Sequence, residues 1–253
     1  MPSGPHDDAR RPRSAVTLGL LGVLIVAMIA GLLALGVWQV ERRAWKLDLI
    51  RQVDARVHAP ASPAPGPDRW ATVTKDRDQY RHVILRGTFQ NDRETLTQAV
   101  TDYGPGFWVM TPFRTDAGFT VLINRGYVST GKRAPESRAA GQIAGETTVQ
   151  GLLRITEPKG GFLRANDPAT ERWRSRDVSA IAAHRGLINV APYFVDADAT
   201  ANPGGWPIGG LTVIRFPNSH LVYALTWFGL ALMLAVGGGI LFWDERRVRR
   251  ALR

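Results

Sequence analysis

The chain has 253 residues, of which 45% are hydrophobic, and a formal net charge of +10 at pH 7. It contains no cysteine, which excludes disulfides, thiolate copper sites, C-x-x-C redox chemistry and covalent attachment of c-type haem. The basic residues are spread along the chain rather than concentrated in one stretch, so we expect no nucleic-acid partner.

The first apolar segment runs from Ser14 to Val40 and contains no Asp, Glu, Lys or Arg. It exceeds the roughly 20 residues that cross a bilayer as a helix. Its most apolar part, Val16 to Leu35, is longer than the roughly 7–15 residues of a signal-peptide apolar region, and no small-x-small cleavage site follows. We therefore predict an uncleaved transmembrane helix over residues 16–38, preceded by a cytoplasmic tail over residues 1–15.

The next stretch, residues 39–68, is expected to be a helical extension followed by a linker. Residues 41–58 have helical periodicity, and Trp38 and Trp45 are placed where indoles settle at a membrane interface. The sequence "APASPAPGP" then follows at residues 59–67. Its prolines predict a stiff, extended spacer.

Residues 69–217 have mainly the pattern of short strands bounded by Gly, Pro, Asn and Asp. Strands are predicted at residues 82–89, 94–99, 107–113, 119–124, 147–154, 193–196 and 211–216. One short helix is predicted near Asp177 to His184, with Asp177 as its N-cap and Gly186 ending it. Glycine-rich loops at Lys159–Phe162 and Asn202–Gly210 are expected at the surface. A β-rich (α+β) periplasmic domain is the expected architecture.

The domain carries few signatures of catalysis. "GYVSTGKR", from Gly126 to Arg133, approaches the phosphate-binding loop G-x-x-x-x-G-K-[ST], but Arg133 replaces the hydroxyl residue and Pro135 obstructs the helix that should follow. A strand followed by a turn is therefore predicted there. Two pairs of nearby aspartates, Asp76 with Asp78 and Asp196 with Asp198, are interpreted as solvated loop carboxylates rather than an acid–base pair.

The second apolar segment, Phe216 to Trp243, again contains no charged residue. It predicts a transmembrane helix over residues 218–243, followed by a basic cytoplasmic tail over residues 244–253. Arginines outside the two segments place both termini in the cytoplasm by the positive-inside rule, and they favour anionic membrane lipid. These arginines are Arg10, Arg11, Arg13, Arg246, Arg247, Arg249, Arg250 and Arg253. The fold class is therefore a membrane protein with two transmembrane helices flanking a β-rich extracytoplasmic domain.

The start of the second helix contains an ionisable ring. If Asn218 caps the helix after Pro217, then His220, Tyr223 and Trp227 fall on one stripe. Such a stripe is typical of an aromatic belt at the level of the lipid headgroups. It also suits a metal site, because neutral imidazole is an axial ligand of haem iron and the aromatic rings offer an apolar wall. The residues alone leave both interpretations open.

An ordered set of motifs resembles the Surfeit locus protein 1 family of cytochrome c oxidase assembly factors. The resemblance covers nearly all of residues 35–242. Tyr127 stands where the family often has tryptophan, which is a mild departure. The motifs are "LGVWQVERRAWK", "GPGFWVMTPF", "VLINRGYV", "ERWRSRDVSAIA", "APYFVDAD" and "PNSHLVYALTWF".

The resemblance implies a non-enzymatic protein of the bacterial inner membrane that transiently binds haem a and assists its insertion into subunit I of an aa3-type oxidase. It implies two partners, subunit I and the haem a synthesis machinery. His220 would be the metal ligand, with Tyr223 and Trp227 beside it. The first-helix motif, with Trp38, Gln39, Arg42, Trp45 and Lys46, would pair with the second helix or meet haem propionates. Arg125, in the "NRG" of the family motif, would form a structural turn or a contact.

Two alternatives remain open. A structural assembly protein would stabilise the oxidase core without holding a cofactor, and His220 would then only be interfacial. An unrelated membrane enzyme is disfavoured because no nucleophile or acid–base constellation is recognisable.

Overall fold

The computed structural model describes residues 13–158 and 165–251. It divides into two compact units, one formed by the chain up to residue 50 together with residues 216–253, and the other by residues 51–215. Arg10, Arg11, Arg253 and the loop predicted at residues 159–162 lie outside the described residues.

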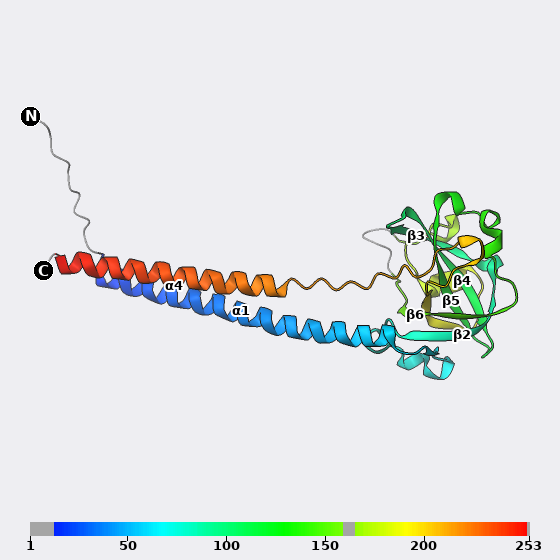
Figure 1. Cartoon of the computed structure of the whole chain (residues 1–253), viewed down its shortest axis with the longest axis horizontal. Helices are drawn as coiled ribbons and strands as arrows, with labels where there is room; N and C mark the ends of the chain where they lie inside the picture. The colour runs from blue at the N-terminus through cyan, green and yellow to red at the C-terminus, as the bar shows by residue number, and fades with distance from the viewer. Residues whose placement is uncertain (1–12, 159–164, 252–253) are drawn as a thin grey trace, which may run out of the picture. The chain divides into compact units, whose positions relative to one another are not determined.

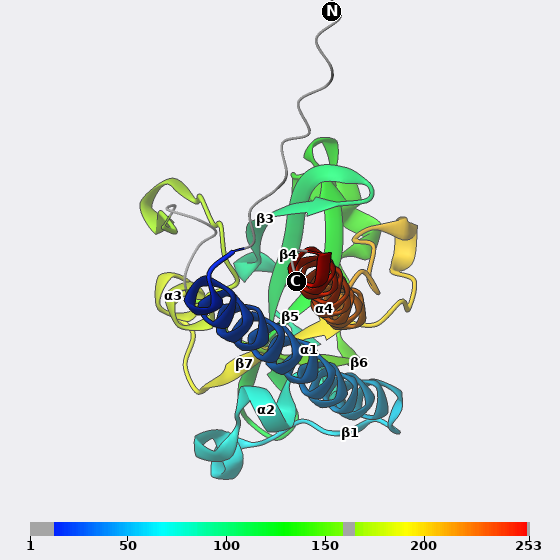
Figure 2. The same ribbon diagram turned by 90° about the vertical axis from the view of Figure 1, so that its left-hand side faces the viewer.

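Within the described residues, two helices are long and apolar enough to cross a membrane, judged by length and composition: α1, Ala15–His58, and α4, His220–Ala251. They run side by side as a helical hairpin (Figures 1 and 2). Large apolar side chains such as Leu20, Val222 and Leu232 are exposed on the hairpin, which is the surface that lipid would cover. The helical extension predicted beyond residue 40 is confirmed, since α1 continues without a break to His58.

Buried residues of α4 recur every seventh position, at Ala224, Ala231, Gly238 and Glu245. A seven-residue repeat keeps one seam of a helix against its partner. Small residues on this seam let the two backbones approach closely. On α1, Gly36 is buried against Phe228, and a Cβ atom at this position would overlap the phenyl ring.

The second unit is a seven-stranded sheet in the order β1-β2-β6-β7-β5-β4-β3. Three further residue pairs join β2 to β4, so that β2, β6, β7, β5 and β4 close into a small barrel. The pair β5–β7 and the pair β1–β2 are parallel, and the other pairs are antiparallel. The strands are β1 Ser62–Pro63, β2 His82–Phe89, β3 Thr95–Thr101, β4 Gly104–Thr115, β5 Thr120–Ser129, β6 Glu146–Ile155 and β7 Val190–Ala197.

Two clusters of apolar side chains form the core of this unit. The larger one includes Phe113, Ile123 and Tyr193 from the neighbouring strands β4, β5 and β7. The smaller one packs helix α3, Val178–His184, through Ile181 against the sheet. The Asp177 carboxylate caps α3 by accepting a hydrogen bond from the backbone N–H of Ala180 at 3.1 Å, as the sequence predicted. A short helix α2, Lys75–Asp78, precedes β2.

Six of the strands predicted between Gly, Pro, Asn and Asp residues are confirmed as β2 to β7, with ends shifted by up to several residues. The strand predicted at residues 211–216 is wrong, because that stretch forms no ladder. The β5 edge beside it is taken by Ile208, which pairs with Tyr127. That pairing also shows that the predicted surface loop Asn202–Gly210 is held against the barrel.

The spacer predicted to be stiff and extended at residues 59–67 is extended at Ser62–Pro63, but it is also paired with the sheet. Ser62 and Pro63 form β1 alongside β2. The carbonyl oxygen of Pro65 accepts hydrogen bonds from Trp70 Nε1 at 3.1 Å and from Tyr193 Oη at 2.7 Å. Prolines are tolerated in this strand because it lies at the edge of the sheet, where a missing N–H costs no ladder bond.

Candidate functional site

The hairpin brings together two of the residues predicted to bind a cofactor. His220 is the first residue of α4, and its Nδ1 lies 2.7 Å from Gln39 Oε1 of α1. Gln39 is only 9% exposed, so its amide faces the seam between the helices. The contact joins residues that are 181 positions apart in the chain.

This hydrogen bond determines the protonation pattern of the neutral ring. The Gln39 amide is oriented with its oxygen towards Nδ1, and in this orientation the oxygen accepts and Nδ1 carries the proton of the neutral ring. The lone pair of a neutral imidazole then resides on Nε2, for which the described part of the chain shows no hydrogen-bond partner. An oriented imidazole with its other nitrogen tied to an oxygen acceptor is the usual arrangement of a metal-ligating histidine. The arrangement of His220 is therefore compatible with a metal-ligating imidazole that would use Nε2.

The other predicted site residues are arranged differently. Tyr223 and Trp38 are 55% and 53% exposed on the outside of the hairpin, and Trp227 is half-buried. The guanidinium carbon of Arg42 lies 3.9 Å from the centre of the Trp45 ring, a stacked cation–π pair. These groups therefore surround the end of the hairpin rather than lining an enclosed cavity with His220.

The cap predicted for α4 is wrong. Asn218 makes no capping bond, and its Oδ1 is buried without a hydrogen-bond partner among the described residues. The first turn is instead closed by the backbone bond from Tyr223 N–H to the carbonyl oxygen of Ser219, at 3.3 Å. His220 therefore lies in the first turn of α4, where the predicted stripe of His220, Tyr223 and Trp227 places it.

Among the described residues, no second histidine makes a hydrogen bond or ion pair with His220. Within the described ranges there is no group of three or more His, Asp or Glu side chains placed to hold a metal. His58, the nearest candidate by sequence, is about 28 Å further along α1 than Gln39 at 1.5 Å per residue. Its Nδ1 is 3.3 Å from the carboxylate of Asp54.

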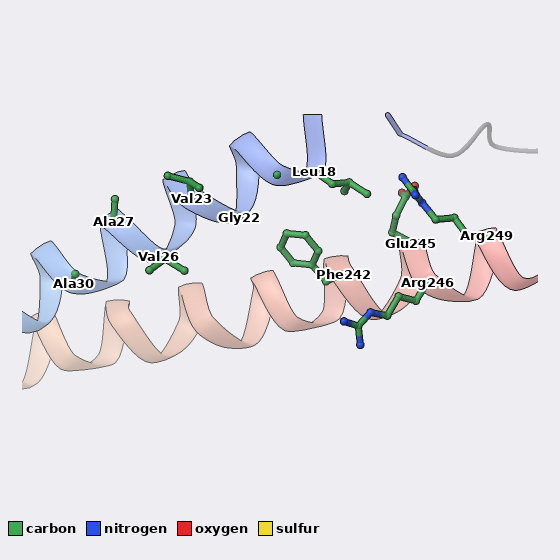
Figure 3. Close-up of a pocket in the computed structure, with 11 residues that line it drawn as sticks. Leu18, Gly22, Val23, Val26, Ala27, Ala30, Phe242, Glu245, Arg246 and Arg249 are labelled. Carbon is green, nitrogen blue, oxygen red and sulfur yellow. The ribbon is translucent and has the colours of Figure 1, made fainter. Parts of the chain in front are cut away.

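The opposite end of the hairpin forms an apolar groove of about 760 Å³ (Figure 3). Val26 and Phe242 project between the helices, and Glu245 lies beside Arg249. The Glu245 carboxylate accepts a hydrogen bond from the backbone N–H of Arg13 at 2.7 Å. None of the residues predicted to bind a cofactor lines this groove.

The β-rich unit contains buried charges that the sequence patterns did not reveal. Arg138 forms a buried ion pair with Glu94. Arg125 is 2% exposed, and its Nη2 donates to the carbonyl oxygen of Gly141 at 2.5 Å and to Asn202 Oδ1 at 2.9 Å. Burial lowers the pKa of Arg125 to about 10, with Glu94 opposing and Arg138 adding to the shift. Arg125 thus stays charged at neutral pH.

The aspartate pairs were only partly interpreted correctly. Asp198 stands in a loop, but Asp78 and Asp196 are buried, at 5% and 3% exposure. The Asp196 carboxylate accepts four hydrogen bonds, from Asn124, Arg154, Arg176 and Thr212. Two of these donors are guanidinium groups, whose charge-assisted hydrogen bonds give the carboxylate a structural role. The stretch resembling a phosphate-binding loop is a strand followed by a 3₁₀ turn, as predicted.

Comparison with known proteins gives a consistent assignment. Residues 26–232 match the model of the SURF1 family. The chain is 37% identical to Surfeit locus protein 1 of Homo sapiens over 214 residues, which cover 78% of this chain and 69% of the human protein. It is 35% identical to the protein of the same name in Rattus norvegicus over 232 residues, covering 85% and 72%. A SURF1-like protein of Monosiga brevicollis is 35% identical over 216 residues, covering 80% of each chain.

Proposed function

Since the chain belongs to the SURF1 family, known for cytochrome c oxidase assembly, we propose that it assembles an aa3-type oxidase by binding haem a transiently. It assists insertion of haem a into subunit I, and it receives the haem from the synthesis machinery. The protein is not an enzyme in this proposal. It resides in the bacterial inner membrane with both termini in the cytoplasm.

The observation that carries the proposal is the Gln39–His220 hydrogen bond. Haem a, when bound, would supply an iron that an imidazole nitrogen can hold, and His220 would be the residue that holds it. Gln39 holds the His220 ring and leaves Nε2 with the lone pair. Tyr223, Trp227 and Trp38 add apolar ring surface, and Arg42 adds a cation that suits a propionate. The exposed position of these rings suits a carrier that must release its cargo.

The two helices favour membrane placement because their length and composition suffice to span a bilayer. Arg246, Arg247, Arg249 and Arg250 follow the apolar part of α4, and such a cluster favours the cytoplasmic side. Anionic lipid headgroups are the expected neighbours of these arginines.

The test is substitution of His220 in the full-length protein purified from cells that make haem a. We expect His220→Ala to accumulate normally but to lose most of the co-purifying haem a, measured by its absorption spectrum, because no lone pair remains for the iron. Host oxidase activity should fall in parallel. Tyr223→Leu and Trp227→Leu should have milder effects, since they change only the surroundings of the ligand.

A second candidate is a structural assembly protein that holds no cofactor, and one observation favours it. The Gln39–His220 bond also ties α1 to α4, which is sufficient reason for a polar pair in a helical seam. His220→Gln distinguishes the two, because glutamine keeps a polar group at this level but is a poor ligand for iron. Full haem content and full oxidase activity in this variant would rule out ligation by His220.

A further inference from the structure

A cavity of about 460 Å³ lies in the β-rich unit beside an unpaired part of β6. Strand β6 pairs with β7 only through residues 151–155, while its first residues pair with β2 alone. Beyond Gln150, whose carbonyl oxygen accepts from the backbone N–H of Asp198 at 3.0 Å, the edge of β6 is open. The cavity is lined by apolar and by polar side chains. The apolar ones include Phe89, Ile143 and Val149, and the polar ones include Thr147, Thr148 and Asn202.

Arg125 also lines this cavity, and no carboxylate of the described residues forms an ion pair with its guanidinium. Among the described residues, every hydrogen-bond partner of its guanidinium is a neutral oxygen, including Asn91 Oδ1 at 3.5 Å. The nearby carboxylate of Glu94 is paired with Arg138. The group of Arg125, Arg138 and Glu94 thus carries one unbalanced positive charge, which is costly to keep away from water.

We propose that this cavity binds a carboxylate ligand through Arg125. The guanidinium supplies charge-assisted hydrogen bonds to the carboxylate, and Phe89, Ile143 and Val149 receive an apolar body. Two sources offer this chemistry. One is the free C-terminus of an extended peptide, which would add to the open edge of β6; the other is a small organic acid.

The negative charge of Asp198 repels a carboxylate bound in this cavity. A substitution of Asp198 should therefore change the affinity in the direction opposite to a substitution of Arg125. Asp198 lines the same cavity, and its Oδ1 accepts from the backbone N–H of Thr200 at 2.9 Å. The charges that shift the pKa of Arg125 are those of Glu94 and Arg138, so Asp198 does not neutralise Arg125 directly. Removing its charge should strengthen carboxylate binding.

The experiment uses the full-length protein in lipid nanodiscs and ¹⁹F NMR of four probes. Two probes are N-trifluoroacetyl-Val-Thr-Val with a free carboxylate and the same peptide as a C-terminal amide. The other two are 4-fluorobenzoate and 4-fluorobenzamide. We expect line broadening and saturable binding for at least one acid and not for its matched amide. Comparison of the two acids identifies the source of the carboxylate.

Four substitutions test the assignment to this cavity. Arg125→Gln should weaken binding of the acid by at least about tenfold, because an ionic hydrogen bond is lost. Asp198→Asn should tighten it a few-fold. Arg114→Gln, which removes an exposed arginine of β4, is the matched control and should change nothing. Ala201→Trp fills the cavity from an exposed position and should abolish binding without touching Arg125.

Ala201→Trp and Asp198→Asn decide the outcome if circular dichroism shows that Arg125→Gln does not fold. The proposal is overturned by equal binding of acid and amide, by acid binding that survives Ala201→Trp, or by no binding of either acid to the wild-type protein. It stands independently of haem binding, because neither His220 nor Gln39 contributes to the cavity.

Discussion

Gln39 illustrates how a single side chain can set the chemistry of another. Its amide oxygen accepts from His220 Nδ1 at 2.7 Å, and the proton on Nδ1 leaves the lone pair on Nε2. The motif resemblance left open whether Gln39 pairs with the second helix or meets propionates. The structure shows pairing with the second helix.

We predict that Gln39→Leu alters the tautomer of His220 even without haem. In wild-type protein carrying ¹⁵N-labelled histidine, the ring nitrogens of His220 should give the shifts of a protonated Nδ1 and an unprotonated Nε2. In Gln39→Leu the shifts should move towards a mixture of tautomers, because the acceptor is gone. Trp38→Leu, the adjacent but exposed position, is the control. Unchanged shifts in Gln39→Leu would contradict the role of this bond.

Tyr193 gives a prediction about alkaline stability. Burial raises the pKa of Tyr193 well above its usual value of about 10, and its hydroxyl donates to Pro65. Above pH 10 the unfolded chain loses this proton while the folded protein keeps it, so stability falls as pH rises through this range. Below pH 10 this contribution is fully present.

Tyr193→Phe should therefore lower the free energy of unfolding by about 1 kcal/mol at neutral pH, the usual contribution of one hydrogen bond. Its free energy of unfolding should also fall less steeply than that of the wild type above pH 10. Urea unfolding at several pH values checks both points. Parallel pH profiles for the two proteins would show that Tyr193 does not have this role.

In the hairpin of α1 and α4, small side chains determine which face of α4 packs against α1. The repeat of Ala224, Ala231 and Gly238 is visible in the sequence, yet it gives no apolar stripe because the whole segment is apolar. A hydropathy pattern therefore predicts the span but not the seam. Of the four buried residues, Glu245 is the only charged one, and it is the only one that distinguishes the buried face of α4 in the sequence.

We predict that Gly36→Leu disrupts the hairpin while Gly31→Leu does not. A side chain at position 36 overlaps the Phe228 ring, whereas nothing lies within 4 Å of a Cβ at position 31. Overpacking of this kind costs about 1–3 kcal/mol.

The measurement uses the absence of native cysteine. Cysteines introduced at Ile25 and Gly238, where a Cβ at 238 would lie 3.2 Å from Ile25 Cγ2, should form a disulfide. The yield should drop with Gly36→Leu and stay high with Gly31→Leu. Equal yields would mean that Gly36 is not needed for close packing.

For the whole molecule, the sequence predicted the two long helices and most of the strands because hydropathy and alternation are local signals. Closure of the barrel through β2 and β4 could not be predicted, because pairing depends on neighbours distant in sequence. Residues 211–216 alternate as a strand would, but Ile208 occupies the available edge. The Arg125 cavity was likewise hidden, since its lining comes from four separate stretches of the chain.

Topology of the whole molecule can be measured directly. Reporter fusions at Pro65 and at Arg253 should give a periplasmic and a cytoplasmic signal respectively, because two spans return the chain to its starting side. A fusion at Arg51 should report the same side as Pro65. Signals from one side of the membrane at Pro65 and Arg253 would contradict the two-span arrangement.

The position of β7 between β5 and β6 has a consequence for biosynthesis. The last strand to be made fills the gap between two earlier ones, so the barrel has no closed hydrogen-bonding ring until residue 197 has been synthesised. Long-range pairings of this kind fold slowly. Helix α1 emerges from the ribosome well before that point, and the nascent domain passes through an interval with open strand edges. Chaperones that bind exposed strands would act during this interval.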